Sequence, residues 1–186
     1  DLPWTWRDER TLMTSVWSDR VRTIPAPEEH SRWFSARLAR PLTLVHLPDA
    51  TKRRTDGRYA QGLTSLSDAF PYLIAWQSSL DDLNARLDVP VPMDRFRPNL
   101  VIAGGTPYQE DAWRAISIGT ERFHLVKPCA RCVIVTTDQR TGARGKEPLR
   151  TLASYRSKGN KVMFGMNAVG DTNGTVKVGA LVSVLS

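Results

Sequence analysis

Two cysteines three positions apart are the residues of this chain best suited to chemistry. The segment Lys127-Pro-Cys-Ala-Arg-Cys132 contains a C-x-x-C pair, a pattern found in zinc sites, redox-active dithiols and ordinary apolar packing. A structural zinc site needs four ligands, and the histidines at His30, His46 and His124 show no paired spacing. A thioredoxin-like dithiol needs its first cysteine at a helix N-terminus, whereas Cys132–Thr137 is rich in Val and Thr and predicts a strand.

The basic neighbours of the pair favour another chemistry. Lys127 and Arg131 lie beside the cysteines, and a nearby cation favours the thiolate form of a cysteine. A single thiolate on a strand is a suitable protein ligand for a soft metal centre. The pattern predicts a thiolate site in a basic pocket; it does not identify the metal, and burial of both cysteines in a core stays open.

A basic cluster precedes the cysteines by many residues. Lys52-Arg53-Arg54 and Arg58 stand in a polar stretch without interleaved aromatic residues, in a chain with 26 Lys and Arg, 19 Asp and Glu and a net charge of +7. The cluster fits a solvated loop, a loop that faces a phosphate-bearing ligand, or a contact with nucleic acid. Nucleic acid is disfavoured because no helix-turn-helix, zinc-finger or RNA-binding signature accompanies the charge.

Composition excludes several classes of protein. With 186 residues, 41% hydrophobic and 24% charged, the chain has the composition of a globular protein of about one domain and a fraction. No apolar run approaches the ~20 residues of a membrane-spanning helix, and no signal peptide opens the chain. The two cysteines are too close together to be a disulfide scaffold.

The elements that must position these residues are mostly strands. The pattern predicts a helix over 27–38, a polar loop over 48–66, a helix that begins with Ser78 or Ser79 as its N-cap and a helix over 147–156. Strands are expected over 42–47, 68–76, 99–103, 114–118, 121–127, 132–137 and 175–185. Many short strands with a few helices indicate a mainly β fold, a barrel or a sandwich, and disfavour a Rossmann fold.

Several motifs resemble those of the MOSC family, named after the C-terminal domain of molybdenum-cofactor sulfurase. Within it, the chain resembles the branch of the mitochondrial amidoxime-reducing component and its bacterial relatives. The motifs follow the family's order over roughly residues 40–186 and comprise Asp68-Ala-Phe-Pro-Tyr-Leu, Ser79-Leu-Asp-Asp-Leu-Asn, Phe96-Arg-Pro-Asn-Leu-Val, Glu110-Asp-Ala-Trp, Cys129-Ala-Arg-Cys, Lys146-Glu-Pro-Leu-Arg-Thr-Leu, Phe164-Gly-Met-Asn and Gly174-Thr-Val-Lys-Val-Gly.

The resemblance implies a MOSC β-barrel that binds molybdopterin with its molybdenum. Cys132 would be the protein ligand of the metal, and Asp68 would be the acid nearest the substrate; these two are the expected catalytic residues. The cofactor-binding residues implied by the family's pattern are Cys132, Arg97, Asn99, Ala130, Arg131, Asn167, Ala69 and Phe70. Each has an ordinary alternative as a surface, turn or loop residue, and Cys129 and His124 fit structural roles.

The domain organisation expected from the resemblance has two parts. Residues 1–40 are interpreted as the tail of an N-terminal MOSC-associated β domain, with Trp17 in a strand, and residues 41–186 as the MOSC domain. Residues 1–40 lack the Lys-Ser motif with which the front domain of relatives binds the cofactor phosphate, and no cysteine-rich ferredoxin extension follows Ser186. Electrons are therefore expected from a separate ferredoxin-like or cytochrome b5-like protein with its reductase, and the expected location is the bacterial cytoplasm, without membrane attachment.

Three functions follow as hypotheses. The first is a molybdenum-dependent oxidoreductase that reduces N-hydroxylated compounds such as amidoximes and hydroxylamines. The second is a carrier of the molybdenum cofactor or of sulfur without turnover of its own. The third, remote from both, is a basic nucleic-acid-binding domain that uses Lys52–Arg58, and it predicts binding that falls steeply with salt.

Overall fold

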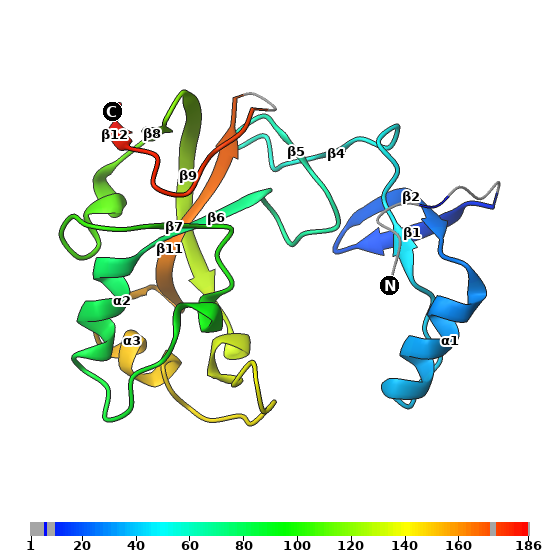
Figure 1. The fold of residues 1–186 in the computed structure, drawn as a ribbon, viewed down its shortest axis with the longest axis horizontal. Helices are drawn as coiled ribbons and strands as arrows, with labels where there is room; N and C mark the ends of the chain where they lie inside the picture. Colours follow the sequence, from blue (N-terminus) through cyan, green and yellow to red (C-terminus); the bar gives the residue numbers. More distant parts are fainter. Residues whose placement is uncertain (1–5, 7–9, 172–173, 186) are drawn as a thin grey trace. The chain divides into compact units, whose positions relative to one another are not determined.

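The computed structural model describes residue 6, residues 10–171 and residues 174–185, and these fall into two compact units. The first unit comprises the described residues up to Gly57 together with Leu63–Ala69. The second unit comprises Arg58–Gly62 together with the described residues from Phe70 onward. Figure 1 shows the elements of each unit along the chain. The predicted boundary at residues 40 and 41 falls within the first unit.

The first unit is built on a small antiparallel sheet. Its elements are β1 (Leu12–Val16), β2 (Asp19–Pro25), α1 (Glu28–Arg37), β3 (Val45–His46), β4 (Arg53–Arg54) and β5 (Leu63–Thr64). Strand β2 pairs with both β1 and β3, while β4 pairs with β5. The predicted helix over 27–38 is confirmed: it begins after Pro27, and acidic residues in its first turn and Arg37 in its last turn oppose the helix dipole.

Three expectations for the first unit differ from the structure. Trp17 lies in the turn between β1 and β2, with a left-handed φ of 55°, because a two-residue connection joins these strands. The loop predicted over 48–66 contains the short strands β4 and β5, and the strand predicted over 42–47 shortens to β3.

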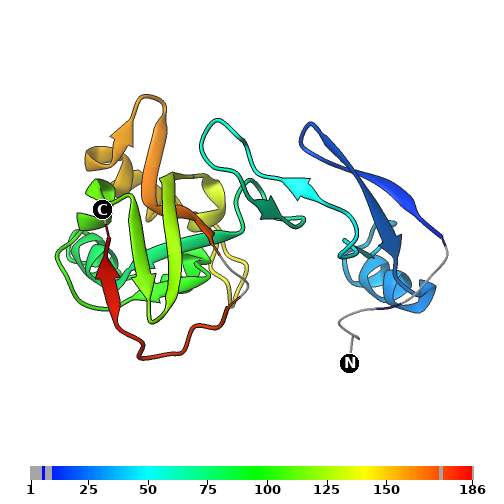
Figure 2. The same ribbon diagram turned by 90° about the horizontal axis from the view of Figure 1, so that it is seen from above.

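The second unit forms, among its described residues, a curved, barrel-like sheet of seven strands. The strand order is β12-β8-β9-β11-β6-β7, with β10 also paired to β11. Figure 2 shows β12 (red) at the end of this sheet, beside β8 (green). The strands are β6 (Tyr72–Trp76), β7 (Leu100–Ile102), β8 (Ala115–Ile118), β9 (Glu121–Arg131), β10 (Ser157–Lys158), β11 (Lys161–Gly170) and β12 (Val182–Val184). The predicted mainly β, barrel-like fold is confirmed.

Helices and single turns cover one side of this sheet. They are α2 (Gln77–Asn84), η1 (Met93–Phe96), η2 (Gln109–Ala112), η3 (Val133–Thr136) and α3 (Leu149–Tyr155), the η elements being 3₁₀ turns. Leu83, Val135 and Leu152 from these elements form one buried cluster with Phe96 and Phe164. The strands bury a second cluster around Trp76 and Ile116. In the part of the chain that is described, no helix is long and apolar enough to span a membrane.

Three predicted elements of the second unit differ from the structure where they touch the motifs. Strand β9 continues to Arg131, and the strand predicted over 132–137 is instead the 3₁₀ turn η3 after an extended Cys132. Helix α2 begins at Gln77, directly after β6, so Ser79 is a buried helical residue and neither Ser78 nor Ser79 is the N-cap. The C-terminal strand expected over 175–185 shortens to β12, because only Val182–Val184 pair with β8.

Candidate functional site

Cys132 lies at the point where β9 ends. Its backbone is extended, with φ −117° and ψ −177°, and η3 begins at the next residue. The side chain of Cys132 is exposed, whereas Cys129, three residues earlier on β9, is half-buried, and both are free thiols. The expected strand after Cys132, which argued against a thioredoxin-like dithiol, is a 3₁₀ turn. Cys129 nevertheless lies within strand β9 and not at a helix N-terminus, where a helix dipole would activate the first cysteine of such a dithiol.

Arg131 ties the end of β9 to the motif that contains Arg97. Its Nη2 donates a hydrogen bond of 2.7 Å to the carbonyl of Phe96, and its Nη1 donates one of 3.1 Å to Sγ of Cys129. The guanidinium also lies 5.6 Å from the centre of the Phe96 ring. Arg131 is therefore engaged with the protein itself, and its expected cofactor contact would be made from a side chain already held in place.

Phe96 joins this pair of motifs to a third. Its ring stacks on Phe164 of β11, with centroids 3.9 Å apart, and both rings are buried. The motifs that contain Phe96, Cys132 and Phe164 are far apart in the sequence, yet they meet at this one ring. This convergence is the main structural reason to place a site at the end of β9.

Arg97 follows Phe96 directly and is exposed. Its backbone adopts the left-handed region, with φ 52°, which costs a non-glycine residue about 1 kcal/mol. Within the described residues, no ion pair of the Arg97 side chain is found. The structure thus presents, at a backbone position that disfavours any side chain, a guanidinium suited to bidentate contact with an anion.

Asn99 and Asn167 flank the same residue of β6. Asn99 forms two hydrogen bonds with the backbone of Leu73. Its backbone N–H donates to the Leu73 carbonyl, and its side-chain Oδ1 accepts from the Leu73 N–H, each at 2.8 Å. Asn167 is the register partner of Leu73 on β11, and its Nδ2 donates a long bond of 3.4 Å to the carbonyl of Lys127. Both asparagines are thus partly used by the sheet, and Nδ2 of Asn99 keeps the donors that a ligand could take.

The remaining predicted residues divide between the two units. Ala130 is exposed on β9, opposite Met163 of β11, and Phe70 is buried in the second unit with its ring near Lys127 Nζ. Asp68 and Ala69 belong to the first unit and are both exposed. The Asp68 carboxylate accepts a hydrogen bond from the indole N–H of Trp17.

The turn around Asp68 is organised by a residue of the basic cluster. Arg53 is only 6% exposed, and its guanidinium pairs with Asp19 at 2.7 Å. The same side chain donates to the carbonyls of Ser65, Ser67 and Asp68 at 2.9, 2.6 and 3.2 Å. None of the three interpretations of the basic cluster anticipated this, because the partners of Arg53 lie 12 to 34 residues away in the sequence.

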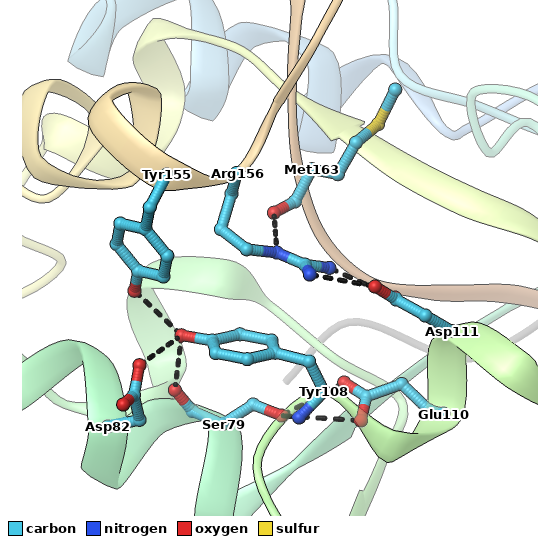
Figure 3. Close-up of polar contacts among 8 residues, drawn as sticks. All are labelled: Ser79, Asp82, Tyr108, Glu110, Asp111, Tyr155, Arg156 and Met163. Atoms are coloured by element: carbon cyan, nitrogen blue, oxygen red, sulfur yellow. Dashed lines mark hydrogen bonds and ion pairs between the residues drawn. The ribbon is translucent and has the colours of Figure 1, made fainter.

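A buried polar network that sequence reasoning missed supports the same end of the sheet. Ser79 Oγ donates to the Glu110 carboxylate at 3.0 and 3.3 Å and accepts from the backbone N–H of Tyr108 at 2.9 Å. As Figure 3 shows, the Tyr108 hydroxyl lies among the Ser79 carbonyl, Asp82 and the hydroxyl of Tyr155. The motifs that begin at Ser79 and Glu110 were visible in the sequence, but their pairing was not.

Burial governs the electrostatics of this network. Glu110 is 0% exposed, and this desolvation raises the pKa of its carboxyl group, against the opposing effect of the Ser79 hydrogen bond. Arg156 forms a bidentate pair with Asp111 at 2.7 and 2.9 Å and donates to the carbonyl of Met163 on β11. The network therefore joins α2, η2 and α3 to the strand that carries Asn167.

The donor set fits a metal that brings its own ligands. The described residues contain no group of three or more His, Cys, Asp or Glu side chains that could hold a metal ion. Cys132 offers one exposed sulfur, and Arg97 offers one exposed guanidinium. A single soft ligand beside a free cation matches a cofactor in which the metal is carried by sulfur groups of an anionic organic molecule.

Comparison with known proteins defines the family. A model of the MOSC domain matches residues 61–183, and the chain belongs to the MOSC family. It is 36% identical over 173 residues to mitochondrial amidoxime-reducing component 1 of Homo sapiens, and the matched region covers 85% of this chain and 51% of that protein. It is 36% identical over 170 residues to molybdenum cofactor sulfurase of Oryza sativa subsp. japonica, covering 81% of the chain and 21% of that protein.

Both groups of relatives recur in other organisms. Molybdenum cofactor sulfurase of Solanum lycopersicum is 35% identical over 183 residues, which covers 87% of the chain and 22% of that protein. The chain thus spans about half the length of the amidoxime-reducing component and about a fifth of the sulfurases. The similarity supports a function connected with the molybdenum cofactor.

Proposed function

We propose that this chain is the MOSC part of a molybdenum-cofactor-dependent reductase of N-hydroxylated compounds such as amidoximes and hydroxylamines. The observation that carries the proposal is the exposed Cys132 at the end of β9, beside a loop with an exposed Arg97 that Arg131 fixes through Phe96. The similarity to an amidoxime-reducing component over 85% of the chain supports the choice of reaction.

Each residue has a defined role in this proposal. The thiolate of Cys132 would ligate molybdenum, and Arg97 would bind the phosphate of the cofactor. The other residues that would line the cofactor are Asn99, Ala130, Arg131, Asn167, Ala69 and Phe70. When bound, the cofactor would supply the two electrons needed to cleave an N–O bond. Phe96, Phe164 and the Ser79–Glu110 pair would hold the strand end and its loop in place.

The reduction also needs protons. Conversion of an amidoxime to an amidine and water consumes two electrons and two protons. Asp68 is proposed as the acid on the substrate side, because the Trp17 indole and the Arg53 guanidinium hold its side chain and its carbonyl, respectively. Carboxyl groups are among the side chains that serve in general acid–base catalysis.

Replacement of the metal ligand tests the proposal. In cofactor-loaded protein supplied with an artificial electron donor, Cys132→Ala is expected to abolish benzamidoxime reduction and to change the molybdenum absorption spectrum. Cys129→Ala is the matched control, because it removes the other sulfur of the motif, and it is expected to retain turnover. Unchanged turnover in Cys132→Ala would refute the assignment. In the native system we propose a separate ferredoxin-like or cytochrome b5-like electron donor.

A second candidate function is favoured by the similarity to molybdenum cofactor sulfurases over 81% and 87% of the chain. In that case the same residues would bind the cofactor, or Cys132 would carry a persulfide, and the chain would have no turnover of its own. Elemental analysis for molybdenum, combined with the benzamidoxime assay, separates the two functions. Stoichiometric loading without reduction would favour the carrier, and loading with Cys132-dependent reduction would favour the enzyme.

A further inference from the structure

A cavity of about 560 Å³ lies in the second unit beside the first half of β9. Its lining comes from residues 59–61, the residue before β8, the middle of β9 and the end of β11. The volume is in the range of small-molecule sites in proteins. His124, in its lining, precedes Cys132 by eight residues, which corresponds to about 26 Å along an extended strand. The cavity is therefore distant from Cys132, although the Tyr59 ring in its lining lies 6.4 Å from the ring of Phe70.

The strand register brings a histidine and a carboxylate together at this cavity. His124 on β9 lies opposite Val169 on β11, and Asp171 follows Val169 by two residues. The side chains of His124 and Asp171 therefore lie on the same face of the sheet. Asp171 Oδ1 lies 2.7 Å from Nε2 of His124, and its Oδ2 lies 3.8 Å from Nε of Arg122. The side chain of Asp171 is thus already engaged by two basic groups.

Among the charged residues of the lining, Asp171 already has basic partners, whereas Arg114 does not have an acidic one in the described part of the chain. All lining residues are described, and Asp171 is the one acidic residue among them. Arg114 lines the same cavity and is exposed; its backbone is fixed, since its carbonyl accepts from the N–H of Leu125 at 2.8 Å. Among the described residues, Arg114 has no ion-pair partner. A guanidinium of this kind is suited to bidentate contact with a carboxylate or phosphate group.

The rest of the lining distinguishes between these anions. Leu125 and Val169 are buried with 3% and 6% of their surface exposed, and Val126 and the ring of Tyr59 add further apolar surface. Lys127 Nζ lies 4.1 Å from the centre of the Tyr59 ring and so holds this ring against β9. Apolar walls favour a ligand with an apolar body over a fully hydrated inorganic ion.

We propose that this cavity binds a small organic carboxylate with an apolar body. The carboxylate pairs with the guanidinium of Arg114, the imidazole of His124 supplies a second polar contact, and the apolar body lies against Val126, Val169 and Tyr59. Asp171 positions His124. The proposal is independent of the molybdenum chemistry, since it uses neither Cys132 nor any other residue assigned to the cofactor.

Titration of the full chain with benzoate tests the proposal. Benzoate is expected to bind with a dissociation constant on the order of 1 mM and to shift the backbone amide resonances of Arg114 and Gly170. Arg114→Gln is expected to weaken binding by about tenfold or more, the usual effect of losing hydrogen bonds to a charged group. Arg140→Gln is the matched control: it removes the same charge from an exposed turn outside the cavity and should leave binding unchanged.

Two further probes, one a neutral alcohol and the other an inorganic anion, complete the design. Benzyl alcohol, which has the ring without the charge, is expected to bind at least tenfold more weakly than benzoate. Inorganic phosphate is also expected to bind more weakly, because it gains nothing from the apolar walls. Absence of saturable benzoate binding, equal binding by Arg114→Gln, or phosphate binding as tight as that of benzoate would each overturn the proposal.

Discussion

Replacement of Glu110 by Gln should change the pH dependence of stability in one defined direction. The Glu110 side chain is 0% exposed, and the single hydroxyl donor of Ser79 lies 3.0 and 3.3 Å from its two carboxyl oxygens. Gln has nearly the same volume and keeps an oxygen that can accept from Ser79, so the packing is retained. The substitution removes the ionisation of a carboxyl group whose pKa is raised by burial.

The sign of the effect follows from the two states. Unfolded Glu110 loses its proton near its ordinary pKa of 4.5, whereas the folded protein still holds that proton. Between the unfolded and the folded pKa, the native state binds more protons, so the free energy of unfolding falls as pH rises, by up to about 1.4 kcal/mol per pH unit. Glu110→Gln lacks this slope. The variant and the wild type should therefore converge below pH 4.5, and the variant should be the more stable one above it.

Other carboxyl groups act in a different pH range and can be separated. Asp82, Asp138 and Glu147 have lowered pKa values because of hydrogen bonds to Arg86, Thr141 and Thr151, with burial opposing the shift. Their stabilisation is present above the unfolded values of 3.8 and 4.5 and is lost as pH falls through the folded ones. Their contribution therefore lies on the acid side of the window of Glu110.

Urea unfolding from pH 4 to pH 8 measures the difference. The amide resonances of Phe123 and Ala168 report on the second unit alone, because both residues lie in its sheet. Asp88→Asn is the matched control, since it removes an exposed carboxylate of the same unit and should run parallel to the wild type. A Glu110→Gln profile parallel to the wild type above pH 4.5 would refute the argument that burial holds the proton on Glu110.

Two further predictions concern the positioning of the site. Arg53→Lys should destabilise the first unit by about 2–3 kcal/mol, because one ammonium group cannot replace the four hydrogen bonds that Arg53 donates to Asp19 and three carbonyls. Faster hydrogen exchange at the Ser67 amide should report this loss. Arg54→Lys, at an exposed neighbouring residue, is the control. Gly165→Ala should lower the stability measured by thermal unfolding by at least about 1–2 kcal/mol, because Gly165 has a φ of 73° and a Cβ there would lie 2.8 Å from the Ile74 carbonyl oxygen. Gly159→Ala, with open space around the new Cβ, should cost less. Equal losses in the two variants would contradict the steric argument.

Local patterns predicted the helix α1 and half of the strands (β3, β6, β7, β8, β9 and β12), but they missed β11 and failed at the end of β9. Val133-Ile-Val-Thr-Thr137 has the β-branched composition of a strand. The structure instead buries Val135 and Thr136 and exposes Val133 and Ile134, an arrangement without the alternation of a strand. Packing of Val135 among Phe96 and the helices decides this turn, and such packing is a property of the fold rather than of the local sequence.

The polar partnerships of the site were beyond sequence reasoning for the same reason. Ser79 precedes two aspartates and so fits an N-cap, yet its partner is Glu110, 31 residues away. Arg53 stands in a run of cations and so fits a solvated loop, yet it is buried against carbonyls. In both cases the residue type limits the possible roles, and only the fold shows which distant group satisfies it.

The family motifs contain two kinds of residue, and the structure separates them. Cys132, Arg97 and Ala130 are exposed and available to a ligand. Ser79, Glu110, Phe96 and Phe164 are buried and bond or stack with one another. The buried group fixes the strand end and the left-handed loop from which the exposed group projects, and a ligand site must be held by such a shell to within a fraction of an ångström. Under the proposed function, loss of a buried member should therefore reduce cofactor affinity without removing any contact to the cofactor. In Phe96→Leu, which unstacks Phe164 while keeping an apolar side chain, molybdenum occupancy should fall even in samples that urea titration shows to be fully folded. Wild-type occupancy in such samples would contradict this role of the buried group.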